Sequence, residues 1–195
     1  MATRAEALKE IRAHIKREVA MGFSPDDDIL ESATEFAEDE YKEFQLSSAV
    51  PGILSKAIEE HVKNQHLWPE ITDCDRLDAA FADLEKNGIV ARQDFACCQT
   101  CGHAEIDDEI SEAMKHNSIV GFTFYHHQDT QRATDQGELL LAYGGLDGED
   151  ESTLNIGRRI VACLKRHDLK VMWKEDVKKR IQVTLDWKRR RVVKG

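Results

Sequence analysis

Three of the five cysteines in this 195-residue chain lie close together, as Cys97, Cys98 and Cys101, and His103 follows two positions later. The Cys-x-x-Cys spacing lets two sulfurs converge on one soft metal ion or on each other. An apolar segment precedes these cysteines and an amphipathic segment follows them, which predicts a turn between a strand and a helix. Amides at a helix N-terminus lower the pKa of a nearby thiol, so this turn favours the thiolate that either chemistry requires.

Three interpretations of these cysteines stay open from the sequence. In the first, a zinc ion has four ligands, which are Cys98, Cys101, His103 and either His126 or His127. In the second, a thiol-dependent enzyme uses Cys98 or Cys101 as its nucleophile and His126 as its base. In the third, the cysteines are small apolar residues that pack in the core and shape the turn. The chain has no second Cys-x-x-Cys pair, so the zinc signature is incomplete and catalytic residues stay unassigned.

A second cluster of polar residues follows a predicted strand, at His126, His127, Gln128, Asp129 and Thr130. This segment joins two strands that we expect to be neighbours, but it is longer than an ordinary hairpin loop. Because long polar connections commonly carry binding residues, we assign His127, Gln128, Asp129 and Thr130, together with Cys97, to a binding surface. Asp129 either orients a histidine or caps a short turn of helix, and the capping role is favoured.

The first 68 residues carry apolar side chains at helical spacing and predict three helices, which begin near residues 3, 24 and 51. A fourth helix begins at Thr72 or Asp73 and ends at Asn87 and Gly88. After Gly88 the pattern changes to short apolar runs separated by amphipathic segments. It predicts strands over residues 89–95, 119–126, 139–143, 171–175 and 181–187, and helices over residues 104–115 and 152–167.

The order after Gly88 is therefore β-α-β-β-α-β with one extra C-terminal strand, which predicts a ferredoxin-like α+β domain. We expect a helical N-terminal segment over residues 1–68 and the ferredoxin-like domain over residues 70–195. In that topology the third strand lies between the first and the second, whose carboxyl ends share one edge of the sheet about 10 Å apart. This edge would bring the cysteine turn close to His126 and His127.

The net charge of -10 is distributed unevenly along the chain. Nine acids and one lysine lie between Ser24 and Phe44, whereas residues 165–195 carry twelve Lys and Arg against four acids. These regions can attract each other within one molecule, attract each other between molecules, or bind separate partners. A regulator that binds protein or RNA is thus a third functional class. We do not expect nucleic-acid binding, because the aromatic RNP pattern is absent and the overall charge is acidic.

The composition, with 41% hydrophobic and 33% charged residues, is typical of soluble globular proteins. No apolar run approaches the length of a membrane span, and the N-terminus has no signal-peptide pattern. An odd number of cysteines in a chain of this size indicates reduced thiols, so we expect a cytoplasmic protein. The oligomeric state does not follow from the sequence.

Several sequence runs resemble a bacterial family of unknown function: residues 88–95, 97–106, 121–130 and 140–144. In these runs, which include the CCQTCGH and YHHQDT motifs, the chain is similar to domain-of-unknown-function family 6891, over roughly residues 70–187. The family brings no established activity, so the resemblance implies a bacterial origin and no catalytic residues. Our leading hypothesis is a non-enzymatic cytoplasmic module that binds zinc or a partner protein through the cysteine turn and the segment 126–130.

Overall fold

The computed structural model describes residues 3–191. The chain divides into two compact units. In the described range the first unit consists of residues 3–70 together with residues 188–191, and the second of residues 71–187. Residues 188–191, which the predicted boundary assigned to the second domain, thus belong with the N-terminal helices. None of the helices in the described range is long and apolar enough to cross a membrane.

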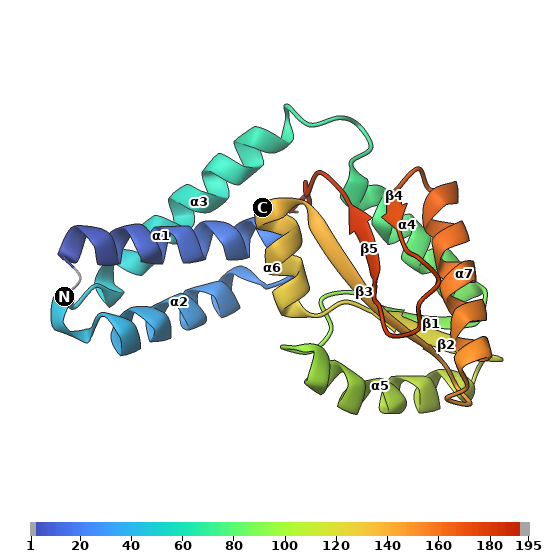
Figure 1. Ribbon diagram of the computed structural model, residues 1–195. Helices are drawn as coiled ribbons and strands as arrows, with labels where there is room; N and C mark the ends of the chain where they lie inside the picture. The colour runs from blue at the N-terminus through green and yellow to red at the C-terminus, as the bar shows by residue number, and fades with distance from the viewer. Residues whose placement is uncertain (1–2, 192–195) are drawn as a thin grey trace. The chain divides into compact units, whose positions relative to one another are not determined.

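Three helices form the first unit: α1 (Arg4–Met21), α2 (Asp26–Glu40) and α3 (Val50–Gln65), with the short 3-10 turns η1 (Lys42–Phe44) and η2 (Ser47–Ala49) between α2 and α3 (Figure 1). Thr3 caps α1, and Gly22 ends it in the left-handed conformation that glycine adopts at little cost. The apolar stripe of α1 packs against the other two helices. The buried side chains are Ala7, Ile11, Ile15, Val19, Ile29, Ala33, Ala37, Val50, Leu54 and Ala57.

The basic C-terminal segment binds within this helical unit. Arg191 donates a hydrogen bond of 3.0 Å to the carbonyl of Ser24 and forms an ion pair with Asp26, in the first turn of α2. The guanidinium of Arg189 lies 4.3 Å from the centre of the Phe23 ring, a cation–π contact. The charge pattern left open whether the acidic and basic regions attract each other within one molecule, attract each other between molecules or bind separate partners. For Asp26 and Arg191 the structure shows attraction within one molecule.

The second unit is a five-stranded mixed sheet with helices between its strands. In chain order its elements are α4 (Asp73–Lys86), β1 (Ile89–Arg92), α5 (Gln99–Met114), β2 (Gly121–Phe124), α6 (His127–Gln136), β3 (Glu138–Gly145), α7 (Asp150–Arg166), β4 (Lys170–Met172) and β5 (Ile181–Thr184). The strand order is β1-β2-β3-β5-β4. Only the β1–β2 pair is parallel among the described strands. The α+β class predicted from the sequence is confirmed.

The ferredoxin-like strand order is not what the sheet shows. β3 does not lie between β1 and β2; these two strands are direct neighbours, with Ile89 opposite Gly121 and Arg92 opposite Phe124. The crossover helix α5 can join parallel strands that are adjacent or that have another strand between them, so the order of elements in the sequence does not fix the strand order. The helix α6 also fills the connection that we expected to be a long loop. The carboxyl ends of β1 and β2 are therefore one strand spacing apart, about 4.8 Å, and not about 10 Å.

Side chains after β1 and along β2 alternate between the two faces of the sheet. Phe122 and Phe124 face α5, where they contact His103 and Gly102. Gly121 faces Ile156 of α7, and the ring centres of Tyr125 and Phe81 of α4 are 5.6 Å apart. Figure 1 shows α5 on one side of the sheet and α4 and α7 on the other. Since His126 continues the extended chain, the alternation places its side chain on the α5 side, as the hypothesis of a shared site requires.

Candidate metal centre

The turn that carries the cysteines has a constrained backbone. Asp94 and Ala96 both adopt left-handed conformations, with φ of 49° and 60°, at a cost of about 1 kcal/mol or more each for residues other than glycine. Two backbone hydrogen bonds to the neighbouring connection hold them there. Phe95 donates to the carbonyl of Tyr125 at 2.9 Å, and His127 donates to the carbonyl of Ala96 at 3.1 Å. The cysteine turn is therefore fixed to the carboxyl end of β2.

The three neighbouring cysteines form one group of sulfur atoms. The helix α5 begins at Gln99, five residues earlier than predicted, so that Cys98 is its N-cap residue and Cys101 lies in its first turn. The Sγ atoms of Cys97, Cys98 and Cys101 all lie within 4.8 Å of one another. Cys97 donates to the Cys101 sulfur at 3.3 Å. Cys97 is exposed and the other two are half-buried, so the group is open to solvent.

The thiols of Cys98 and Cys101 have pKa values shifted in opposite directions. The backbone amide of Cys101, together with the thiols of Cys101 and Cys97, lowers the pKa of Cys98. Hydrogen bonds with Cys97 and Cys98 raise the pKa of Cys101 to about 12. The arrangement thus favours the thiolate of Cys98 over that of Cys101.

The predicted histidine ligands do not join the sulfur group. His103 is exposed, with its ring edge-on to Phe124 and the ring centres 5.1 Å apart, and partial desolvation of the ring followed by the charge of Arg180 lowers its pKa. His126 is buried, and its Nε2 lies 2.9 Å from a carboxylate oxygen of Asp129. Its Nδ1 accepts the backbone N–H of Asp129, so the neutral ring carries its proton on Nε2. Burial is the main cause that lowers the pKa of His126.

The predicted binding residues of segment 126–130 mostly hold this edge of the sheet together. His126 and Asp129 cap α6 reciprocally, and Arg180 donates to Asp129 at 2.8 Å. Asp129 therefore both caps the helix and orients a histidine, the two roles that the sequence left open. Gln128, by contrast, is exposed on the first turn of α6.

The turn and α6 are joined by a second set of polar contacts. Thr130 is fully buried and donates to the carboxylate of Asp94 at 2.5 Å. An oxygen of the same carboxylate lies 3.4 Å from Nδ1 of His127. One carboxylate thus links the cysteine turn to two of the predicted binding residues, which places them in a supporting role around the sulfur group.

Sequence reasoning missed Asp94 and Arg180. Nothing in the sequence around Asp94 distinguishes it from a surface acid, because its importance comes from a left-handed turn that only the structure reveals. Arg180 belongs to the run Lys178-Lys179-Arg180, which was part of the basic C-terminal charge. Its contact with Asp129 spans 51 residues and depends on the strand order.

A second group of ligating atoms lies between α4 and α7, at Asp83, Cys163 and His167. Here Arg166 already pairs with Asp83 at 3.1 Å, and Cys163 donates to the carbonyl of Ala80 at 3.5 Å. Burial raises the pKa of Cys163, which keeps its proton on. The polar groups of this cluster already form hydrogen bonds and ion pairs within the protein, so we assign them to the packing of α4 against α7.

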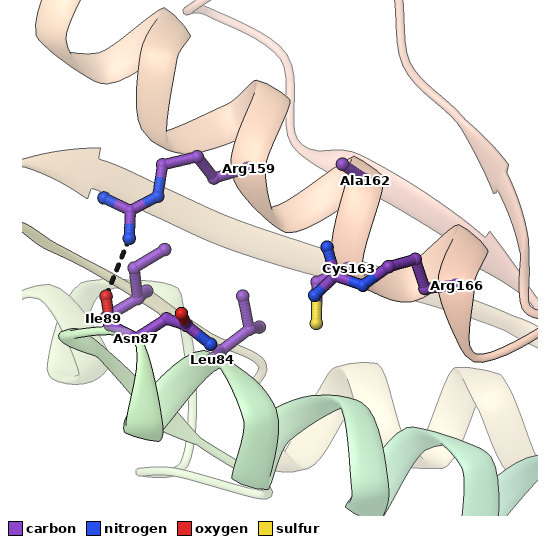
Figure 2. A pocket seen from close by; sticks show the side chains of 7 residues that line it. All are labelled: Leu84, Asn87, Ile89, Arg159, Ala162, Cys163 and Arg166. Carbon is purple, nitrogen blue, oxygen red and sulfur yellow. Dashed lines mark hydrogen bonds between the residues drawn. The ribbon is translucent and has the colours of Figure 1, made fainter.

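A cavity of about 150 Å³ adjoins this second group (Figure 2). Its lining consists of Leu84, Asn87, Ile89, Arg159, Ala162, Cys163 and Arg166. Figure 2 shows Arg159 reaching from α7 to the carbonyl of Asn87 at the end of α4, a hydrogen bond of 2.7 Å. Both arginines of the cavity thus make bonds within the protein. This engagement leaves the exposed sulfur group at the sheet edge as the stronger candidate for binding.

The sequence model of a family described as a domain of unknown function (DUF6891) matches residues 4–191. The chain belongs to this family. The DUF6891 match covers the helical N-terminal unit as well as the sheet unit, and is thus wider than the resemblance over residues 70–187. A search of curated proteins and a search of solved structures find no match.

Proposed function

We propose that this DUF6891 protein binds one soft or borderline metal ion, zinc in the first place, through Cys97, Cys98 and Cys101. The observation that carries the proposal is that the three sulfurs lie within 4.8 Å of one another and are open to solvent. Zinc–sulfur bonds of about 2.3 Å at tetrahedral angles separate the sulfurs by about 3.8 Å. Small side-chain rotations would bring all three sulfurs to that separation.

Binding at this site requires the sulfurs to lose protons. Cys98 is the thiol whose surroundings already favour the thiolate, whereas the pKa of Cys101 is raised to about 12 by its neighbours. A metal ion replaces those shared protons, so its affinity increases with pH. The helix N-terminus of α5 adds a favourable field for the negative charge of the sulfurs.

Three sulfur ligands leave one position of a tetrahedral ion open. His103 packs against phenylalanines, and His126 is held by Asp129, to which Arg180 also donates, so we assign the open position to water or to a group from a binding partner. An open fourth position lets the ion exchange one ligand with another molecule. Because Asp129 engages His126, the base that a thiol-dependent enzyme would use, we assign this exchange to delivery or sensing of a metal by a cytoplasmic, non-enzymatic binding module.

The test is metal titration of the protein prepared under reducing, oxygen-free conditions. Elemental analysis and cobalt titration should both give one ion per chain, with intense sulfur-to-cobalt charge-transfer absorption. Cys97→Ser, Cys98→Ser and Cys101→Ser should each abolish tight binding. Cys74→Ala removes a buried thiol outside the group and serves as the matched control. A wild-type protein that binds no cobalt or zinc at micromolar concentrations would refute the proposal.

The lowered pKa of Cys98 also favours a second candidate, a thiol-dependent enzyme with Cys98 as nucleophile. His126 is unsuited to be its base, since Nδ1 accepts the Asp129 amide and Nε2 faces the Asp129 carboxylate. The rate of alkylation by iodoacetamide as a function of pH separates the two candidates. If metal-free protein reacts fast at Cys98 below pH 7 while metal titration fails, the enzyme is the better assignment.

A further inference from the structure

Two of the three sulfurs are already in contact, although they belong to differently constrained parts of the turn. The Sγ atoms of Cys97 and Cys101 are 3.3 Å apart. A disulfide needs about 2.05 Å between them, so the two atoms must approach by roughly 1.2 Å. Cys101 is held in the first turn of α5, whereas Cys97 precedes the N-cap residue and is exposed. Movement of the Cys97 side chain alone can supply most of this approach.

We propose that the sulfur group is a redox switch, in which a hydroperoxide links Cys97 to Cys101 and so removes two of the three metal ligands. The release of metal rests on the proposed metal binding, whereas formation of the bond does not. The product keeps Cys98 as a free thiol at the N-cap. One remaining sulfur ligand cannot hold zinc tightly, so oxidation and metal occupancy exclude each other.

The chemistry balances with a hydroperoxide as the only co-reactant. The sulfur of one cysteine attacks a peroxide oxygen and breaks the O–O bond, which gives a sulfenic acid; the departing oxygen takes the thiol proton and leaves as water or an alcohol. The sulfur of the second cysteine then attacks the sulfenic sulfur and forms the S–S bond. The hydroxide expelled takes the second thiol proton and leaves as water. The two sulfurs lose two electrons, and the peroxide gains them.

The identity of the first sulfur to react does not decide the product. All three Sγ atoms lie within 4.8 Å, so thiol–disulfide exchange can move a bond formed with Cys98 to another pair. A Cys97–Cys98 bond would join adjacent residues, in which the geometry of a disulfide is strained. Cys74 and Cys163 are 1% and 2% exposed, which shields them from the oxidant.

The experiment treats the metal-free protein with one equivalent of hydrogen peroxide, blocks free thiols with N-ethylmaleimide, then reduces the sample and labels it with iodoacetamide. All three cysteines lie in the tryptic peptide between Arg92 and Lys115, so tandem mass spectrometry must read the label at each position. We expect iodoacetamide label on Cys97 and Cys101 and maleimide on Cys98. Iodoacetamide label mainly on Cys98, or the absence of any intramolecular disulfide, would overturn the assignment of the bond to Cys97 and Cys101.

Variants and metal measurements separate this inference from the proposed function. Cys98→Ser should still form the disulfide, whereas Cys97→Ser should not. Zinc should bind the oxidised wild-type protein at least about 100-fold more weakly than the reduced protein, and a reductant should restore the affinity. If the disulfide forms but the reduced protein binds no zinc, the metal proposal fails and the thiol switch stands alone. If the reduced protein binds zinc but peroxide forms no disulfide between Cys97 and Cys101, the switch is refuted and the metal proposal survives. If zinc binds equally to the reduced and the disulfide forms, both proposals are refuted.

Discussion

Gly102 follows the last cysteine of the group and controls how closely α5 approaches the sheet. A Cβ atom added at this position would lie 2.4 Å from Cε2 of Phe124 and 2.8 Å from its Cζ. Ordinary contact begins near 3.4 Å, so the helix and the ring must separate by about 1.0 Å (3.4 minus 2.4). Phe124 is fully buried among Val90, Ile106 and Ile110 and has little room to move. The helix, and the cysteines with it, must therefore shift.

Gly102→Ala should lower the free energy of unfolding of the sheet unit. Overpacking of a core costs about 1–3 kcal/mol. Replacing a helical glycine with alanine returns about 1 kcal/mol of helix propensity, which leaves a net loss of up to about 2 kcal/mol. The clash itself is measured more cleanly in a double-mutant cycle with Phe124→Leu, which removes the ring atoms concerned. We expect the two substitutions to be coupled by at least about 1 kcal/mol, with the double variant more stable than additivity predicts.

The assay is urea denaturation followed by tryptophan fluorescence in a Trp68→Phe background, where Trp173 and Trp187 of the sheet unit are the remaining tryptophans. Gly52→Ala is the matched control, because a Cβ at this helical glycine of α3 meets nothing within 4 Å. That control should leave the unfolding of the sheet unit unchanged. The close approach of α5 would be refuted by a stabilising Gly102→Ala with no coupling to Phe124→Leu.

Three further predictions concern polar groups that stabilise one unit or the other from within. Burial lowers the pKa of His126 in the folded state below its ordinary value of 6.5, so the unfolded chain binds more protons at low pH. The sheet unit should therefore lose stability as the pH falls below about 6.5. His126→Asn should reduce the difference between the free energies of unfolding measured at pH 5 and at pH 7.5. Thr130→Val should cost about 1–3 kcal/mol, because it leaves the Asp94 carboxylate without its buried donor, and Thr130→Ser should recover most of the loss. Arg191→Met should lower the melting temperature of the helical unit by a few degrees in calorimetry, whereas the same substitution at exposed Arg166 of the sheet unit should leave that transition in place.

The sequence predicted most elements because their apolar residues follow the helical or strand period. The stripe Leu8, Ile11, Ile15 and Val19 identifies α1, and the alternation from Ile181 identifies β5. The helix α6 was missed because it is polar almost throughout, with Ala133 its single buried apolar residue. A histidine at the N-cap gives no conventional start signal for it.

The strand order and the full site depend on contacts that a list of elements does not contain. The same succession of strands and helices is compatible with β1 beside β2 or with another strand between them, and the structure has the first arrangement. The cysteine spacing identified the sulfur group correctly, since Cys98 and Cys101 are close in sequence. His126 was expected beside them, but Asp129 engages its ring, and Asp129 is held in turn by Arg180 from a distant part of the chain.

The helical unit is completed by a segment made long after its helices. Arg191 pairs with Asp26 across 165 residues of chain, and the whole sheet unit lies between them in the sequence. At a synthesis rate of about 5–20 residues per second, α2 emerges roughly 8–33 s before its partner. During that interval the acidic first turn of α2 has no arginine from the C-terminal segment, while the sheet unit is translated and can fold. The ion pair between Arg191 and Asp26 thus forms only after translation has passed the sheet unit, so the N-terminal unit gains this contact later than the contacts among its own helices become possible.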